Sequence, residues 1–358
     1  MRTSIFTLAA VLWAVSLFSQ ADPAAKPAPQ PEKHLRNIRQ LTFGGDNAEA
    51  YWSPNSKWLT FQSNNAKWGV KCDQIFAMKL KKAENNPAYQ PLPISNSKGR
   101  TTCSYFMPDG KHILFASTMA GADTCPPTPD LRAGGKYLWS IYSSYDIYVA
   151  DLKGNIVKRL TDTPGYDAEA VLSPKGDKIL FTSIRSGDLE LWTMDIDGSN
   201  QKQITNLPGY DGGAFFNADG TKIVFRASRP KPGAELKEYQ ELLAEGLVAP
   251  VSMEIFTCNA DGSNLHQVTN LGKANWAPFF HPSGKKIIFS SNHHSTRGYD
   301  FQLYMINEDG TGLEAITSQS IFNSFAMFSP DGKKLAWSSN RDNGGTRDTN
   351  VFVADWVD

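Results

Sequence analysis

Polar residues recur at one position of a repeated sequence unit, and this position is the best candidate for ligand chemistry. The copies were aligned on the turn proline or its equivalent. Seven residues before it stand Asn47, Thr101, Asp167, Asp211, Asn275 and Asn323. Two residues further along stand Glu49, Cys103, Glu169, Gly213, Ala277 and Phe325. Alternate side chains share one face of a strand, so we expect both sets to rim one opening.

Four of these residues are acidic, and the ligand they would suit follows from their charge. Glu49, Asp167, Glu169 and Asp211 should form an arc of negative charge. Clustered carboxylates need cations or basic partners, so the arc predicts a site for a cation or a basic ligand. Arg100, beside the ring, is expected to add a ligand contact. The alternative is that these side chains cap the local loops, as Asp and Asn often do.

A second polar set follows the next strand of each repeat and has a structural explanation. It comprises Arg185, Arg229, His293 and Arg341, each four residues past an aromatic residue. We expect each base to pair with the acid that opens the third strand of its own repeat, as Arg185 would with Asp188. Such pairs would tie strand ends together.

Catalytic signatures are thin, and we assign no catalytic residue. The chain has no G-x-S-x-G elbow and no H-E-x-x-H motif. Turns such as Asp195-Ile196-Asp197-Gly198 resemble the start of a calcium loop but lack its downstream ligands. Only His293 and His294 could meet the acidic arc, which would create a divalent-metal site. Otherwise no cofactor is expected.

The elements that position these residues repeat six times. In residues 166–198, alternating apolar residues predict strands at 168–172, 178–183 and 189–194, with a short fourth strand at 202–205. The turn Ser173-Pro174-Lys175-Gly176 joins the first two strands, and similar turns occur in the other copies. The sequence therefore predicts six four-stranded antiparallel sheets.

The order of the strands predicts how these sheets close into a ring. One fourth strand, at 38–42, precedes the first complete repeat, and the last repeat stops after its third strand. The N-terminal strand should therefore complete the last blade of an all-β, six-bladed β-propeller with no open edge. Deleting residues 22–43 should unfold the protein, whereas trimming residues 22–34 should be harmless.

The repeat resembles that of a known family. The run S-P-D-G-K-K-L-A-W-S-S-N-R at 329–341, followed by V-F-V-A-D, is similar to the blades of TolB-type propellers, and the likeness extends over residues 36–356. It implies a propeller of the cell envelope that binds or scaffolds other molecules. TolB also has an α/β domain before its propeller, and here only a short linker is expected, so that domain's roles do not carry over.

Composition and the N-terminus limit the partners and the location. Lys plus Arg and Asp plus Glu both total 36, so no net charge attracts nucleic acid. Arg2, an apolar run at 5–17 and Ser19-Gln20-Ala21 predict a signal peptide over residues 1–21, followed by a linker at 22–35 and a propeller at 36–358. No other stretch is long enough to span a membrane. We expect a periplasmic or secreted monomer.

Two long loops and the cysteines complete the prediction. Residues 119–144 carry Tyr137, Trp139 and Tyr142, and residues 230–251 contain a predicted helix at 234–245. These loops would form a partial lid over one mouth, or else fill gaps between blades. A disulfide between Cys103 and Cys125 is expected near this mouth, with Cys258 a buried free thiol.

The function predicted from the sequence is binding rather than catalysis. The ligand would be an envelope protein, a peptide or a glycan, held in the lidded mouth. The alternative is a metal-assisted enzyme that acts on a polysaccharide or a peptide at the same mouth.

Overall fold

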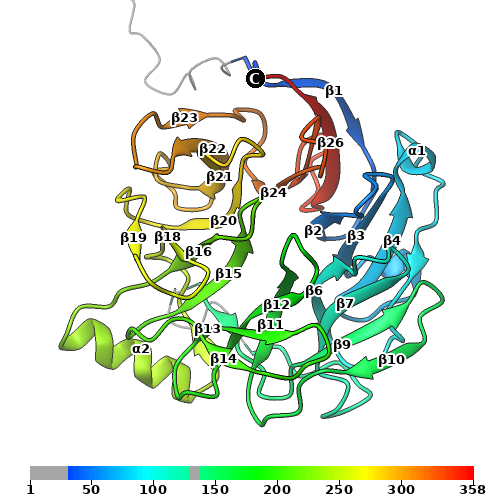
Figure 1. Ribbon diagram of the computed structural model, residues 1–358. Helices are drawn as coiled ribbons and strands as arrows, with labels where there is room; N and C mark the ends of the chain where they lie inside the picture. Colours follow the sequence, from blue (N-terminus) through cyan, green and yellow to red (C-terminus); the bar gives the residue numbers. More distant parts are fainter. Residues whose placement is uncertain (1–30, 130–134, 136) are drawn as a thin grey trace, which may run out of the picture.

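A computed structural model describes residues 31–129, 135 and 137–358, which form six four-stranded antiparallel sheets around a central axis (Figure 1). The predicted signal peptide at 1–21 and most of the linker lie outside the described residues. Within the described residues, no helix is long and apolar enough to cross a membrane. The predicted six-bladed β-propeller is confirmed.

Each blade has its first strand nearest the axis. Blade 1 consists of β2 (Asn47–Trp52), β3 (Trp58–Ser63), β4 (Gln74–Lys79) and β5 (Leu92–Pro93). Blade 2 consists of β6 (Thr101–Phe106), β7 (His112–Ser117), β9 (Asp146–Asp151) and β10 (Ile156–Arg159). Blade 3 consists of β11 (Asp167–Leu172), β12 (Lys178–Ser183), β13 (Glu190–Asp195) and β14 (Lys202–Gln203). Blade 4 consists of β15 (Asp211–Phe216), β16 (Lys222–Ala227), β18 (Glu254–Asn259) and β19 (His266–Gln267). Blade 5 consists of β20 (Asn275–Phe280), β21 (Lys286–Ser291), β22 (Gln302–Asn307) and β23 (Glu314–Ala315). Blade 6 consists of β24 (Asn323–Phe328), β25 (Lys334–Ser339), β26 (Asn350–Trp356) and β1 (Leu35–Gln40).

The N-terminal strand closes the ring. β1 lies antiparallel to β26, with Leu35 opposite Trp356 and Gln40 opposite Phe352 (Figure 1). The expected closure is confirmed, although the strand begins three residues earlier than the predicted 38–42. β1 therefore supplies the outer strand that the last repeat lacks, so blade 6 has four strands like the other blades.

The N-terminal contacts begin before β1. Glu32 forms a two-pronged ion pair with Arg341, with N–O distances of 3.0 and 3.1 Å, and both side chains are only 5% exposed. His34 stacks on Trp356. The expectation that trimming residues 22–34 would be harmless conflicts with these contacts, since the trim removes the partner of a buried arginine. The propeller therefore starts near residue 32.

One aromatic position of the second strands forms the centre of each blade. Phe61, Phe115, Phe181, Phe225, Phe289 and Trp337 are all fully buried. A side chain of this size at a buried position contributes about 3–5 kcal/mol relative to alanine. The same position recurs in every blade, so the sheets pack side by side in the same way around the ring.

The two long loops join over one end of the propeller. β8 (Trp139–Ser140) pairs with β17 (Leu247–Val248), and α2 (Ala234–Ala244) precedes β17. Here these loops, residues 119–129, 137–144 and 230–251, are called the lid. The predicted helix at 234–245 is confirmed, and Gly246, with φ of +73°, follows its end. Elsewhere, η1 (Ala66–Trp68) and α1 (Leu80–Ala83) decorate blade 1.

The predicted disulfide has a different partner. Cys125 bonds to Cys72, across 53 residues, and Cys103 and Cys258 are buried free thiols. The pairing of Cys103 with Cys125 is therefore wrong, whereas the free thiol at Cys258 is confirmed. Cys103 lines the central channel, and Cys72 lies on the loop before β4. The bond ties the lid to blade 1.

Candidate functional site

A bulge in each inner strand separates the two polar sets that the sequence suggested would share one rim. The second set, Glu49, Cys103, Glu169, Gly213, Ala277 and Phe325, has φ between +47° and +57°, and the strand register shifts there. A bulge adds one residue and redirects the side chains around it. The second set therefore faces the central channel, while the first set turns into the junctions between blades.

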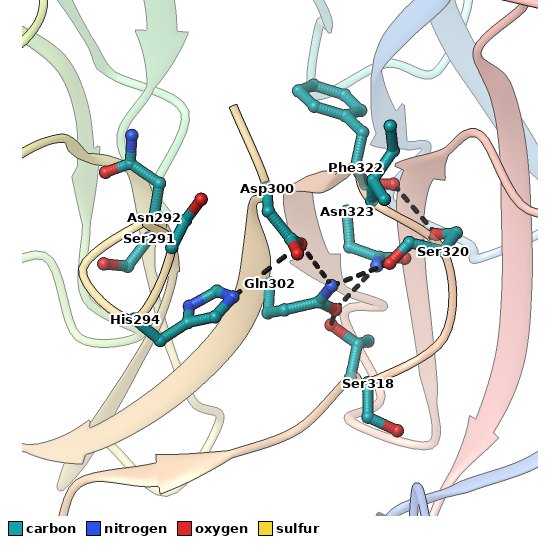
Figure 2. Close-up of polar contacts among 12 residues, drawn as sticks. Ser291, Asn292, His294, Asp300, Gln302, Ser318, Ser320, Phe322 and Asn323 are labelled. Atoms are coloured by element: carbon teal, nitrogen blue, oxygen red, sulfur yellow. Dashed lines mark hydrogen bonds and ion pairs between the residues drawn. The ribbon is translucent and has the colours of Figure 1, made fainter. Parts of the chain in front are cut away.

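The asparagines of the first set tie each blade to the one before it. Asn323 donates from Nδ2 to Oε1 of Gln302 at 2.9 Å (Figure 2). Its Oδ1 accepts from Arg341 at 3.2 Å. Asn275 donates in the same way to Oε2 of Glu254, at 3.0 Å. Asn47 donates to Oδ1 of Asn350, at 3.3 Å. All three are fully buried, so these contacts account for their polarity without a ligand.

The acidic members of the first set are paired with arginines of their own blades. Asp167 accepts from Arg185 at 2.7 Å, and Asp211 accepts from Arg229 at 3.1 Å. The expected pairing of Arg185 with Asp188 is wrong, because the base reaches back to the first strand of its blade. Each arginine also stacks on an aromatic residue of its blade, such as Arg185 on Phe181 at 5.2 Å.

Thr101 and Arg100 occupy the corresponding place between blades 1 and 2. Thr101 is fully buried and donates to the carbonyl of Asp73 at 3.1 Å. Arg100 donates to Oδ2 of Asp73 at 2.8 Å and to Thr128 at 3.2 Å. Its side chain is 24% exposed, which is more than those of Asp167, Glu169 and Asp211. A ligand contact there stays a prediction.

The second set lines a small enclosed space on the axis, the channel chamber, of about 30 Å³. Glu169 is saturated there, because it accepts from Thr182, Tyr210, the amide of Gly213, and Arg226. Arg226 is 7% exposed, so this is a buried ion pair. Such a pair fixes geometry, and it leaves the carboxylate little capacity for a ligand.

Glu49 is the less saturated carboxyl group of the chamber. It accepts from the hydroxyl of Tyr51 at 3.1 Å. Burial raises the pKa of Glu49, and hydrogen bonds from Cys103 and Tyr51 only partly oppose that effect. The four residues of the predicted acidic arc thus divide into two in the channel and two in the blade junctions, and they do not form one continuous surface.

The lid closes the chamber on its own side. Trp139 lies 5.1 Å from the guanidinium of Arg226 and 5.0 Å from the ring of Trp276. Trp276 in turn donates to the carbonyl of Pro250, at the far end of the lid. An aromatic residue that covers a buried charge excludes water from it. Entry from the lid side therefore requires the lid to move.

The two histidines proposed as metal ligands bind neighbouring side chains. His293 contacts Ser291 at 2.9 Å and His294 contacts Tyr304 at 2.9 Å, both through Nδ1. His294 also lies 3.7 Å from Asp300 (Figure 2). Burial lowers the pKa of His293. Within the described residues, no three His, Cys, Asp or Glu side chains are grouped to hold a metal ion.

An open cavity lies at the opposite end of the axis, among the turns that follow the inner strands. This turn-face cup has a volume of about 550 Å³. Its apolar lining includes Trp52, Pro54, Tyr105, Phe106, Pro108, Leu172, Pro174, Phe215, Phe216, Phe279, Phe280, Pro282, Met327, Phe328 and Pro330. None of the described residues that line it is Asp, Glu, Lys or Arg.

Aromatic contacts close the floor of the cup. Tyr51 lies 5.7 Å from Tyr105 and 5.9 Å from Phe215, and Phe215 lies 5.1 Å from Phe279, measured between ring centroids. Tyr51 and Phe215 also line the channel chamber above. The cup is therefore a blind, apolar recess, separated from the charged chamber by one layer of aromatic rings.

Comparisons with known proteins identify the fold. Residues 138–234 match the family described as TolB beta propeller domain. The chain has the TolB-type propeller fold. A putative TolB from Agrobacterium tumefaciens superposes with a TM-score of 0.55 at 20% identity, covering 88% of this chain and 91% of that one. TolB from Acinetobacter baumannii gives 0.51 at 19% identity, over 77% of this chain and 55% of that one.

A third similar structure, of a nidogen/laminin complex, has a TM-score of 0.50 at 13% identity and covers 76% of this chain and 80% of that one. No curated protein matches the chain in sequence. At these identities the likeness establishes the fold, so the binding site has to be argued from the residues of this chain.

Two features of the site were not predicted, although the repeats hold a signal for each. The cup could have been found from the aromatic or apolar residue that ends each inner strand and the proline that usually follows two residues later, as in Trp52 and Pro54. Arg226 could have been found because its equivalents in the other blades, such as Thr182 and Ser290, are uncharged. A charge inside an apolar strand needs a buried partner.

Proposed function

We propose that this chain is a periplasmic or secreted binding module, and that the turn-face cup holds an apolar segment of an envelope protein or peptide. The observation that carries the proposal is the cup itself, a 550 Å³ recess that opens to solvent and presents aromatic rings and prolines. Pockets that bind small ligands or side-chain clusters have volumes of about 300–1,000 Å³ and are mostly apolar. The TolB-type fold and the predicted signal peptide support the location.

The lining favours a peptide or protein segment over a glycan. Apart from the ring groups of Tyr105 and Trp52, the polar side chains among the lining residues are Ser173, Asn217, His281 and Ser329. His281 already contacts Asp358 at 3.2 Å. A glycan presents many hydroxyl groups that would lose their hydrogen bonds to water in such a recess. An apolar side chain loses nothing of this kind on entry.

The surroundings of the cup match the anatomy of a protein interface. Exposed charged residues of both signs surround the apolar centre, among them Asp109, Lys111, Lys175, Asp177 and Lys333. An apolar centre with a charged rim is typical of surfaces that bind other proteins, where a few aromatic residues carry most of the binding energy. Because the floor is closed, the segment enters end-on, as a chain terminus, a loop tip or a projecting side chain.

The proposal is tested with two substitutions in the cup and one on the lid face. Phe216→Ala removes a partly exposed ring, and Ala218→Glu places a charge where other blades have proline. Ser186→Glu adds the same charge to an exposed lid-face loop. The mature chain and its variants would be used to select peptides from a random displayed library, and the selected peptides would be titrated against each protein.

We expect the selected peptides to be rich in aromatic and aliphatic residues. Phe216→Ala should weaken their binding by about 10- to 100-fold, equivalent to about 1.4–2.8 kcal/mol. Ala218→Glu should weaken it at least as much, and Ser186→Glu should leave it unchanged. If Ser186→Glu abolishes binding and the two cup variants bind normally, the site is on the lid face instead.

A further inference from the structure

The junction between blades 3 and 4 differs from the three junctions at which an asparagine amide joins neighbouring blades. At three junctions an asparagine amide donates to the first residue of the preceding blade's third strand, namely Asn47 to Asn350, Asn275 to Glu254 and Asn323 to Gln302. At the corresponding positions between blades 3 and 4 stand Glu190 and Asp211. Neither of these side chains carries an amide donor.

The missing donor leaves a buried carboxyl group without its partner. Glu190 is 2% exposed, and its Oε2 atom has no hydrogen-bond partner among the described residues. Asp211 is fully buried and already accepts from Arg229. The carboxyl groups of Glu190 and Asp211 lie within hydrogen-bonding reach of each other, so they cannot both stay ionised at low cost and one of them retains a proton. That proton supplies the hydrogen-bond donor that the asparagine amide supplies at the three junctions named above.

The surrounding charges place the proton on Glu190. The pKa of Glu190 is raised to about 8, chiefly by burial and further by the negative charges of Asp211 and Asp188, while a hydrogen bond with Thr205 partly opposes this rise. Burial also raises the pKa of Asp211, but Arg229 donates to Asp211 and stabilises its ionised form. The next arginine, Arg185, is occupied by Asp167 and is not available to neutralise Glu190.

The same junction holds the helix of the lid. The hydroxyl of Tyr239, on α2, donates to Oδ1 of Asp188, two residues before Glu190. Oδ2 of Asp188 accepts from the amide of Gly209 at 3.0 Å. Burial raises the pKa of Tyr239 above its ordinary value of 10, so its hydroxyl keeps its proton while Glu190 titrates. Asp188 is the only one of the three acids that lies on a loop and is partly exposed.

We propose that Glu190 and Asp211 share one proton, and that its loss to solvent releases α2 from blade 3. Once Glu190 is ionised, it repels Asp211 and Asp188. Arg229 holds Asp211 in place, so the repulsion is relieved where the structure yields most easily, in the loop that carries Asp188. When that loop moves, Tyr239 loses its acceptor.

The released helix would not remain folded. α2 has 11 residues, none of them buried. Helices shorter than about 12–15 residues are marginal in water without tertiary contacts. Its ordered state therefore depends on contacts such as the one between Tyr239 and Asp188, and loss of that contact should appear as increased backbone exchange along α2. The direction of the pH dependence follows from the raised pKa of Glu190. The contact between Tyr239 and Asp188 is kept below about pH 8 and is lost as the pH rises through that value.

Hydrogen exchange measured by mass spectrometry tests the proposal on the full mature chain. Protection of residues 234–244 would be followed from pH 6.5 to 9 and corrected for intrinsic exchange rates, with residues 286–307 of blade 5 as the internal reference. The test variant is Glu190→Gln, which places the residue type of Gln302 in blade 3. The matched control is Glu254→Gln, at the same position of blade 4, where the carboxylate accepts from Asn275, Thr269 and Gly272.

In the wild type, protection of α2 should fall at least tenfold between pH 7 and pH 9, while blade 5 stays protected. Glu190→Gln should abolish this fall, and Glu254→Gln should retain it. Tyr239→Phe should show low protection of α2 at every pH. The proposal fails if Glu190→Gln follows the wild-type profile, if blade 5 opens together with α2, or if Tyr239→Phe keeps the wild-type response.

Discussion

Replacing Glu32 with glutamine should destabilise the propeller far more than its place near the chain's N-terminus suggests. Glu32 and Arg341 form a two-pronged ion pair at 3.0 and 3.1 Å with both side chains 5% exposed. Arg341 also lies over the ring of Trp337, at 5.0 Å, so it cannot turn out to solvent without losing that packing. Removing one partner of a buried pair typically costs about 3–5 kcal/mol.

The glutamine variant should fall at the lower end of that range, at about 3 kcal/mol. Its amide oxygen can still accept from the amides of Ser318 and Gln319, which now bind Glu32. Arg341 keeps its hydrogen bond to Asn323. The cost is therefore the loss of the negative charge and of one hydrogen bond from Arg341, whereas Glu32→Ala would also leave two backbone donors unpaired and should cost more.

Urea unfolding of the mature chain measures this difference. The control is Lys33→Ala, one residue away, because Lys33 pairs with Glu314 while its side chain is 66% exposed. Exposed pairs contribute at most about 1 kcal/mol. A chain that begins at Leu35 also loses the stacking of His34 on Trp356, so it should be destabilised at least as much as Glu32→Ala. If Glu32→Gln and Lys33→Ala shift the unfolding midpoint equally, with unchanged slopes, the ion pair is not holding the N-terminal segment to blades 5 and 6.

Three further predictions follow from the contacts described above. Cys72→Ser should lower the free energy of unfolding by about 2–4 kcal/mol, and alkylation of the unfolded but unreduced wild type should label two of its four cysteines. Burial works against ionised Asp355, but hydrogen bonds from Lys334 and from β1 outweigh it and lower the pKa, so its stabilising effect is lost as the pH falls below about 4. Asp355→Asn should therefore lose less stability than the wild type between pH 5 and pH 2. Arg226→Leu should cost about 3–5 kcal/mol in thermal or urea unfolding, and adding Glu169→Leu should recover part of that loss because it removes the unpaired charge.

The repeated elements could be predicted because their signals are local. Each pair of inner strands is marked by a turn such as Ser173-Pro174-Lys175-Gly176, and Gly176 has the positive φ, +70°, that the turn requires. The helix at α2 was visible from the spacing of its apolar residues. The missing fourth strand of the last repeat revealed the closure by β1. These features depend on residues near one another in the chain.

The candidate site depends on contacts between blades, which the sequence does not encode locally. No sequence signal marks the bulge, since non-glycine residues such as Glu49 and Cys103 occupy its positive φ. In a regular strand without the bulge, alternate side chains point to the same face, which would put both polar sets on one rim. The disulfide was mispaired for a related reason, because the approach of Cys125 to Cys72 is set by how the lid crosses blade 1. A side chain's partner in the next blade can be read only from the folded ring.

The same bulge explains why the two ends of the axis differ in chemistry. At the lid end, the polar side chains form hydrogen bonds that hold neighbouring blades together, so these contacts determine which residue types occur there. The turn end has no such task, and its inner strands can end in residues chosen for contact with a partner.

The residues that line the cup differ from blade to blade. Blades 2, 4 and 5 each present two aromatic residues, but only blades 4 and 5 are neighbours, with Phe215, Phe216, Phe279 and Phe280, whereas blade 3 presents Leu172. Ala218 replaces the turn proline of blade 4 and widens the rim on that side. An apolar segment in the cup should therefore lean toward blades 4 and 5, where stacking on aromatic rings adds about 0.5–1.5 kcal/mol per pair beyond burial.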